Sequence, residues 1–388
     1  MSIRPKSHAH ANRQSMWHRT SNGRDCTCRV YDPPSGQAKL DLHEGTAQRA
    51  AGGERTVSTG RYSMARRIVF AALAANLIAI SDAMALDPRL PAYETTAGIS
   101  GQIKSVGSDT LNNEMLRWAK AFMGLYPDVK IEVEGKGSAT APPALLAGAS
   151  QLGPMSRPMS AEEADAFEKK YGYKASRFRA AVDTLAVYVN KDNPIECLSL
   201  QQLNRIFSST RKVAFGGDIK TWGDAGLTGE WSTKPISLYG RNSISGTYEF
   251  FKETALYSGN YKAEVKQQPG SEAVIEGVAN DRFGIGYSGI GYKTGGVRTV
   301  PLALFPGATC YETSAEAAYS RKYPLARYLY IYLNRKPNEP LGALIGEFIK
   351  FIVSKDGQTL AEMGGFYSIT NDDRGVDLQK LEIATSAK

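Results

Sequence analysis

Histidine is missing from most of this 388-residue sequence. The four histidines, His8, His10, His18 and His43, all lie near the beginning, and none follows. Without histidine, the rest of the chain cannot build a Ser-His-Asp or Cys-His catalytic centre, and it lacks the imidazole ligands of most zinc sites. We therefore expect no catalytic residues, no metal site and no cofactor in the part of the chain that follows.

An excess of basic residues is also missing once the first part of the chain is set aside. The whole sequence has 47 Lys and Arg against 39 Asp and Glu, but residues 1–85 hold 12 of the basic and 6 of the acidic side chains. The remainder therefore has a net charge of +2. Because a nucleic-acid-binding surface is marked by a strong local excess of Lys and Arg, we expect no nucleic-acid partner.

Long apolar runs are scarce, and the clearest one is short. After Met64, the positive start MARR is followed by IVFAALAANLIAI and by the small residues of Ala83-Met84-Ala85. This order is typical of a secretory signal peptide, whereas a membrane span needs a longer run. We interpret residues 64–85 as a signal cleaved after Ala85, with an anchoring or buried helix as the alternative. Residues 1–63 are interpreted as a misassigned start or a disordered extension.

Cysteine is rare after the signal, where only Cys197 and Cys310 remain. An exported protein reaches an oxidising compartment in which two cysteines can form a disulfide bond. Their separation along the chain does not reveal their distance in space. The sequence therefore leaves this pairing open.

Strand-like and helix-like segments alternate after the signal. VKIEVEG, AVDTLAVYVN and PLARYLYIYL have the composition of strands, whereas LNNEMLRWAKAFMGLYP, SLQQLNRIF and LGALIGEFIKFIVS place apolar residues at helical spacing. The alternation predicts an α/β protein with mostly parallel sheets. The length allows two ordinary domains, each with its own core.

Three strand candidates end in loops of Gly, Ser and Thr that lead into a helix. The loops are VGSDTL with Ser108, Asp109 and Thr110, EGKGSATAPP with Ser138, and RNSISGTY with Ser245, Gly246 and Thr247. A helix N-terminus offers unpaired N–H groups and partial positive charge, and hydroxyls add donors. Each loop alone is explained as an N-cap, but such loops gather at the carboxyl ends of strands, where ligands bind. Together they predict a site for a small tetrahedral anion.

Arg241 opens the third loop and adds a permanent positive charge. A guanidinium can donate two parallel hydrogen bonds to an oxyanion, although a surface salt bridge is the alternative role. A fourth candidate loop is LGPMSRPMS, with Ser156 and Arg157. Its signal is weaker because Ser156 could instead cap the helix predicted from AEEADAFEKKYG.

The order of these motifs resembles that of the periplasmic phosphate-binding proteins that serve ABC importers, which are type II periplasmic binding proteins. GSDTL, GKGSATAPPALLAG, GPMSRPMS, AVYVNKDNPI, RNSISGTYEFF and GIGYSGIGY follow one another between about Ile99 and Ile369. The most specific piece is R-x-x-x-S-G-T, formed by Arg241, Ser245, Gly246 and Thr247. The resemblance implies phosphate binding by these four residues and by Ser108, Thr110 and Ser138.

The fourth loop departs from the family pattern. Well-known members carry an aspartate there that accepts the proton of bound phosphate, whereas this chain has Ser156 followed by Arg157. A carboxylate that only accepts hydrogen bonds would repel fully deprotonated sulfate. Either Asp109 in the first loop replaces this acceptor, which we favour, or Arg157 adds positive charge and relaxes selectivity.

The resemblance also implies the architecture and the partners. Two α/β lobes, residues 86–185 with 290–388 and residues 186–289, would enclose the anion and be joined by crossover strands near residues 184–190 and 284–291. The protein would be a periplasmic monomer that delivers inorganic phosphate to the permease subunits of an ABC importer.

Other functions are weighed against this one. The same scaffold could bind another oxyanion such as sulfate or act in extracellular phosphate sensing, and the altered fourth loop keeps both open. A secreted phosphatase is disfavoured because no histidine follows Ala85 and the loops lack dense Asp and Glu ligands.

Overall fold

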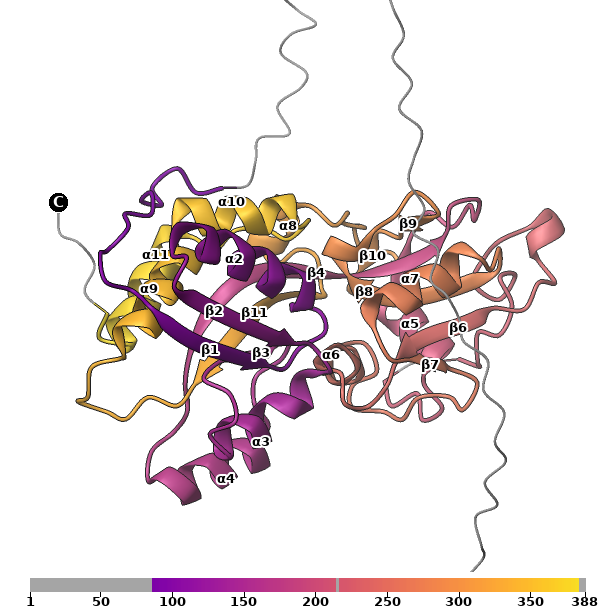
Figure 1. Ribbon diagram of the computed structural model, residues 1–388. Helices are drawn as coiled ribbons and strands as arrows, with labels where there is room; N and C mark the ends of the chain where they lie inside the picture. Colours follow the sequence, from indigo (N-terminus) through magenta and orange to yellow (C-terminus); the bar gives the residue numbers. More distant parts are fainter. Residues whose placement is uncertain (1–85, 214–215, 384–388) are drawn as a thin grey trace, which may run out of the picture. The chain divides into compact units, whose positions relative to one another are not determined.

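The computed structural model describes residues 86–213 and 216–383 (Figure 1). The expected signal peptide and the segment before it lie outside the described residues. Within these ranges, none of the helices combines the length and the apolar character that crossing a bilayer requires.

Helices and strands alternate along the described chain. The helices are α2 (Asn112–Leu125), α3 (Ala141–Leu146), α4 (Ala161–Tyr171), α5 (Leu200–Phe207), α6 (Gly246–Thr254), α7 (Ser271–Ala279), α8 (Ala315–Tyr319), α9 (Ala343–Ile352), α10 (Lys355–Met363) and α11 (Asn371–Lys380), with short 3-10 helices η1 (Ser138–Thr140), η2 (Gly229–Trp231) and η3 (Ile290–Tyr292). The strands are β1 (Gly101–Val106), β2 (Val129–Glu134), β3 (Gly153–Met155), β4 (Ser176–Asn190), β5 (Leu198–Ser199), β6 (Ser237–Arg241), β7 (Lys266–Gln268), β8 (Gly284–Gly289), β9 (Val297–Thr299), β10 (Leu302–Ala303) and β11 (Ala326–Leu333).

One mixed sheet runs through the described residues in the order β3-β11-β4-β8-β6-β7, and β9 also pairs with β4. The pairs β6–β7, β6–β8, β1–β2 and β5–β10 are parallel. The strands β8, β9 and β11 run antiparallel to β4, and β3 runs antiparallel to β11. The α/β class is therefore confirmed, and the sheet is mixed around its longest strand, β4.

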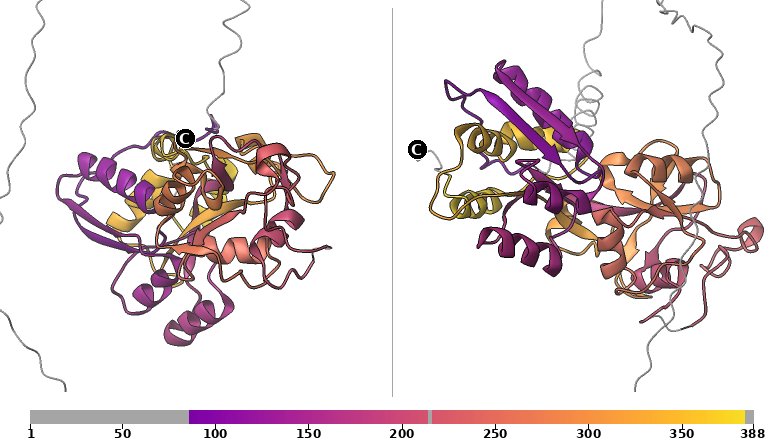
Figure 2. Two further views of the ribbon diagram at one scale, coloured as in Figure 1. Left: turned by 90° about the vertical axis from the view of Figure 1, so that its right-hand side faces the viewer. Right: turned by 60° about the horizontal axis from the view of Figure 1, so that its bottom comes forward.

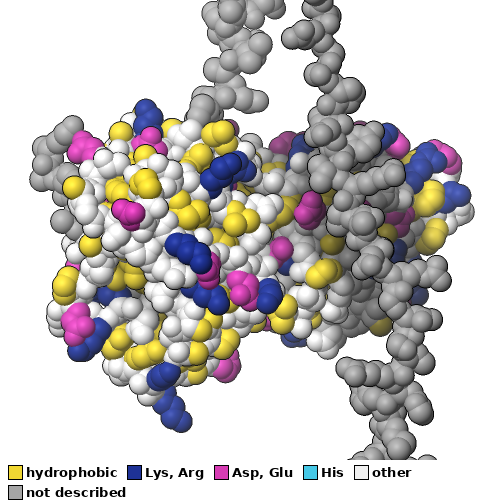
Figure 3. Space-filling model, viewed as in Figure 1, with side chains coloured by type: hydrophobic (Ala, Val, Ile, Leu, Met, Phe, Trp, Pro, Cys, Tyr) yellow, Lys and Arg dark blue, Asp and Glu magenta, His cyan; other side chains and the backbone are white. Residues whose placement is uncertain are grey.

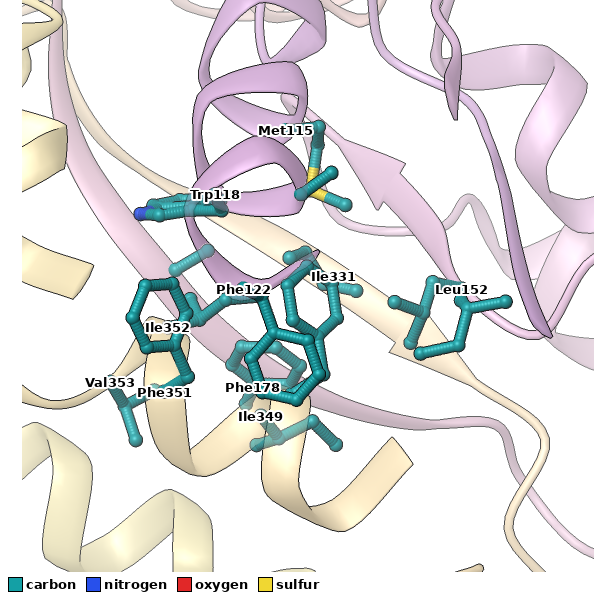
Figure 4. Close-up of a cluster of buried hydrophobic side chains, with 14 of the residues drawn as sticks. Met115, Trp118, Phe122, Leu152, Phe178, Ile331, Ile349, Phe351, Ile352 and Val353 are labelled. Carbon is teal, nitrogen blue, oxygen red and sulfur yellow. The ribbon is translucent and has the colours of Figure 1, made fainter. Parts of the chain in front are cut away.

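Two large hydrophobic cores lie along the two halves of β4. The first core contains Phe178 of β4 together with side chains of α2 and α9, and Figure 4 shows Trp118, Phe122 and Phe351 packed there. The second core contains Val187 of β4 and side chains of α5, α6 and β8. We call the described residues around the first core the first lobe and those around the second core the second lobe. Burial of these apolar side chains is the main stabilising contribution of each lobe.

The chain passes between the lobes along two neighbouring strands. β4 leads from the first core to the second, and β11 leads back, because Leu325 belongs to the second core and Leu329 to the first. Figure 2 shows the described residues from two further directions. The sequence predicted the return near residues 284–291. In the structure, β8 and β10 contribute to the second core, and β9 pairs with the end of β4 beyond it.

The lobe bounds expected from the sequence stay a prediction, but the buried residues group differently along the chain. Side chains up to Leu325 pack in the second core, whereas the sequence assigned everything after residue 289 to the first lobe. The segments β9 and β10 are two or three residues long, which is too short for a periodic pattern to reveal their partner.

A disulfide bond joins Cys197 and Cys310, whose Cα atoms lie 6.2 Å apart. Cys197 directly precedes β5, and Cys310 follows β10, so the bond lies beside the parallel β5–β10 pair. The pairing that the sequence left open is thus formed within the second lobe.

Candidate functional site

The first hydroxyl loop follows β1 and brings its side chains to the edge of the second lobe. The Ser108 N–H donates to Pro154 O (2.7 Å), which ties this loop to β3. The buried Thr110 Oγ1 lies 2.8 Å from Thr247 Oγ1 at the start of α6. The first and third predicted loops therefore meet across the lobes.

The second and fourth loops also come together. The Ser156 N–H donates to Ser138 Oγ (3.0 Å), and the two side-chain oxygens lie 3.2 Å apart. Both serines are buried. Ser156 does not cap the next helix, because Ser160 does so with a full capping box on α4. Its hydroxyl is thus held beside Ser138 rather than at a helix end.

The third loop reaches this pair of serines from the second lobe. Ser245 caps α6 by accepting from the N–H groups of Thr247 and Tyr248. A Cβ added at Gly246 would lie 2.4 Å from Ser138 Oγ and 2.8 Å from Ser156 Oγ, closer than such contacts allow. Glycine is therefore needed here so that the start of α6 can approach the two serines.

Arg241 ends β6 and is held by the first loop of the opposite lobe. Its Nη1 lies 3.0 Å from Asp109 Oδ2 and donates to Ser271 Oγ (2.7 Å). The Asp109 carboxylate also accepts from Ser271 N–H and Oγ, each at 2.8 Å. Burial lowers the pKa of Arg241, and the charge of Asp109 opposes that shift. Ser271, the first residue of α7, is a site residue that the sequence did not single out.

Sequence reasoning also missed a second buried arginine. Arg327 of β11 donates from Nε and Nη2 to Asp183 Oδ2 of β4 (3.0 and 2.8 Å). It further donates from Nη2 to Thr247 Oγ1 (2.9 Å) and from Nη1 to Ser156 O (2.9 Å). Burial lowers the pKa of Arg327, while Asp183 raises it. The sequence contained a signal, because each charged residue lies among apolar residues in its strand.

Arg157 is directed to a different partner. Its Nη1 and Nη2 both lie 2.7 Å from the carboxylate oxygens of Glu163 in α4, and Nη1 also donates to Pro158 O. Within the described residues it makes no hydrogen bond or ion pair with Ser138, Ser156 or Arg241. The structure thus brings together the other predicted site residues, Ser108, Asp109, Thr110, Ser138, Ser156, Arg241, Ser245, Gly246 and Thr247, while Arg157 forms a separate pair.

The meeting point is rich in donors that have no partner inside the protein. Arg241 Nε is buried and makes no hydrogen bond within the described residues. The N–H groups of Thr110, Ser138 and Gly246 likewise have no partner there. A buried donor without a partner costs free energy unless a ligand or water satisfies it. Within the same ranges, no cluster of three or more His, Cys, Asp or Glu residues could hold a metal ion. The unpaired donors are therefore suited to bind an anion.

Comparisons with known proteins agree on the family. A family model described as the PBP superfamily domain matches residues 92–356. The phosphate-binding protein PstS of Pseudomonas aeruginosa is 50% identical over 294 residues, which cover 76% of this chain and 91% of the relative. PstS of Staphylococcus saprophyticus is 28% identical over 286 residues, or 73% of this chain and 85% of the relative.

Solved structures share the fold. A putative phosphate ABC transporter substrate-binding protein from Clostridium perfringens, solved with bound phosphate, has a TM-score of 0.59 at 24% identity and covers 69% of this chain and 100% of its own. A possible phosphate binding protein from Planctomyces limnophilus has a TM-score of 0.52 at 26% identity, with 73% and 98% covered. The chain therefore belongs to the PBP superfamily and, within it, to the family of PstS phosphate-binding proteins.

Proposed function

We propose that this protein captures inorganic phosphate in the periplasm and delivers it to the permease subunits of an ABC importer. A relative named phosphate-binding protein PstS, 50% identical and covered over 91% of its length, supports this function. The family is one of binding proteins, so the protein is not an enzyme.

One observation carries the proposal: the buried Arg241 guanidinium, whose Nε makes no hydrogen bond within the described residues, contacts Asp109 and Ser271 where hydroxyl loops of both lobes meet. Removing an anion from water is costly, and the cost is met only when many donors are already in place. The residues proposed to bind phosphate are Ser108, Thr110, Ser138, Ser156, Arg241, Ser245, Gly246 and Thr247. Arg327 would place a second positive charge next to these residues, because it donates hydrogen bonds to Thr247 and Ser156.

The geometry favours Asp109 over Arg157 as the residue that sets selectivity. Asp109 Oδ2 accepts from Ser271 and pairs with Arg241, whereas Oδ1 makes no hydrogen bond within the described residues. That free oxygen could accept the proton of bound HPO₄²⁻ or H₂PO₄⁻. Arg157 already shares both of its terminal nitrogens with Glu163. We therefore propose Asp109 as the acceptor that replaces the aspartate of the fourth loop.

Calorimetric titration tests this function. The purified protein is titrated with phosphate, arsenate, sulfate and molybdate under one set of conditions. Tight binding of phosphate and of its close analogue arsenate, with sulfate and molybdate ignored, is the expected result. Sulfate binding tighter than phosphate binding would instead support the rival oxyanion, and no binding of any anion would end both proposals.

A further inference from the structure

A trough of about 600 Å³ lies on the outer face of β4 and β11 in the first lobe. Its floor includes Arg177 and Arg179 of β4 and Tyr328 and Tyr330 of β11, and one wall is the C-terminal half of α11. Along β11, half-buried Tyr328 and Tyr330 alternate with buried neighbours, so they lie on the face opposite to Arg327. A second hollow of about 530 Å³ shares Arg321, Tyr328 and Tyr330 with the first and extends it.

The trough carries positive charges that the protein itself does not neutralise. Within the described residues, Arg321 and Lys380 have no ion pair, and Arg177 makes its side-chain hydrogen bond to the neutral Tyr332 hydroxyl (2.8 Å). Arg179 is paired with Asp373 and Asp377, and Lys174 at the rim lies 4.0 Å from Glu168. On the face drawn in Figure 3, Lys and Arg side chains are scattered, and some of them lie beside Asp or Glu side chains. The local excess of cations therefore favours a ligand with several negative charges.

The floor of the trough excludes two common classes of polyanion. The guanidinium of Arg177 lies over the Tyr330 ring at 4.4 Å and that of Arg179 over Tyr328 at 5.3 Å, so guanidinium groups occupy the places where nucleic-acid bases would stack. β11 is hydrogen-bonded to β4 along its length and to β3 at Tyr330–Tyr332, so around Tyr330 it offers no free edge to a peptide strand. These features favour a ligand that is recognised mainly through its negative charges.

We propose that this trough binds a linear chain of phosphate groups, an inorganic polyphosphate. Such a chain is narrow and flexible, carries negative charge along its length, and has neither bases nor a peptide backbone to satisfy. The guanidinium edge of Arg177 and the charges of Arg321 and Lys380 suit phosphate oxygens. The site is separate from the anion site between the lobes and does not depend on the function proposed for it.

The test uses the full mature chain saturated with inorganic phosphate, so that the site between the lobes is occupied. A short linear polyphosphate is titrated at low salt into the wild type, into the double variant Arg177→Gln/Arg321→Gln, and into the charge-matched control Lys191→Gln/Lys293→Gln. We expect binding by the wild type and the control, at least about tenfold weaker binding by the trough variant, and a steep loss of affinity with salt. Inorganic phosphate binding should be unchanged in all three proteins.

Three outcomes would overturn the proposal. Equal affinity in the trough variant and the control would place polyphosphate elsewhere on the surface. Loss of polyphosphate binding in Arg241→Ala would mean that a chain end enters the site between the lobes. Equally tight binding of single-stranded DNA or polyglutamate would show an unselective cationic surface.

Discussion

Asp109 and Arg241 form an ion pair between the lobes, with 3.0 Å separating Asp109 Oδ2 from Arg241 Nη1. Asp109 belongs to the loop after β1, and Arg241 ends β6 in the second lobe. The same carboxylate oxygen accepts two hydrogen bonds from Ser271. The pair therefore sets the position of the guanidinium from the opposite lobe, and Nε is left without a hydrogen bond to any residue that the structure describes.

Replacing Arg241 with alanine should abolish most phosphate affinity. The variant loses a buried charge and leaves the carboxylate of Asp109 without its partner, a change that costs about 3 kcal/mol in binding free energy. Ser243→Ala is the matched control, because Ser243 lies in the same loop but is exposed. Calorimetric titration of both variants with phosphate measures the difference. Small and equal effects at the two positions would place Arg241 outside the site.

Asp109→Asn should weaken phosphate binding by about 2 kcal/mol, as expected for the loss of a hydrogen bond to a charged group. It should also relax the discrimination against sulfate, because an amide can donate to an anion that has no proton to give. Parallel titrations with phosphate and sulfate give the ratio of affinities. If Arg157→Gln changes this ratio while Asp109→Asn leaves it intact, selectivity depends on Arg157 instead.

The anion-binding role proposed for the loops could be predicted from their residue types. Hydroxyl residues and glycine at a strand end leading into a helix indicate exposed amides, and Arg241 stands in that pattern. Asp183 and Arg327 escaped detection because each is the single charge in a predicted segment whose apolar residues indicate a core. Such a charge must find a buried partner, so the pair could have been suspected from AVDTLAVYVN and PLARYLYIYL.

Other features could not be read from the sequence because they depend on distances in space. The Cys197–Cys310 bond joins residues 113 positions apart. Arg157 follows the fourth loop in sequence, but Ser160 begins α4 so that Glu163 faces the guanidinium. The order of residues in the sequence shows neither the Cys197–Cys310 bond nor the Arg157–Glu163 pair.

The buried Asp183–Arg327 pair should matter for both stability and binding. Asp183→Asn leaves the buried guanidinium without its counter-charge and should lower the unfolding free energy by about 3–5 kcal/mol. The double variant Asp183→Asn/Arg327→Met removes both charges and should recover much of that loss. It should still bind phosphate more weakly, because Thr247 and Ser156 lose the donors that hold them.

Urea denaturation and phosphate titration separate these two effects. Lys336→Gln, which breaks an exposed pair with Glu339, is the control and should change neither measurement. If the double variant binds phosphate as tightly as the wild type, Arg327 serves the packing between β4 and β11 alone.

Removing the disulfide should lower stability without changing phosphate affinity. The bond closes a loop of 113 residues, and cross-links of that span stabilise a domain by about 2–4 kcal/mol, mainly through the unfolded state. The double variant Cys197→Ser/Cys310→Ser should therefore unfold at lower urea concentration. Phosphate titration should show an unchanged affinity, since neither cysteine contacts the residues proposed to bind phosphate. An unchanged urea midpoint, or a large loss of affinity, would contradict this assignment.

Stability should fall as the pH rises because of Glu114, a carboxyl in the first turn of α2. Burial raises the pKa of Glu114 to about 8, although the partner Arg117, with Nε at 3.2 Å, acts in the opposite direction. The folded protein therefore keeps a proton that the unfolded chain releases at much lower pH. By linkage, the unfolding free energy decreases between about pH 4.5 and pH 8, by an amount on the order of a few kcal/mol.

Glu114→Gln tests the origin of this slope, because glutamine has the shape of the protonated acid and does not ionise. The variant should be about as stable as the wild type near pH 5 and more stable at pH 8, as measured by urea denaturation at each pH. Glu132→Gln, at a partly exposed position of β2, should retain the wild-type slope. Parallel pH profiles for Glu114→Gln and the wild type would mean that Glu114 is ionised in the folded protein and that Arg117, rather than burial, dominates its environment.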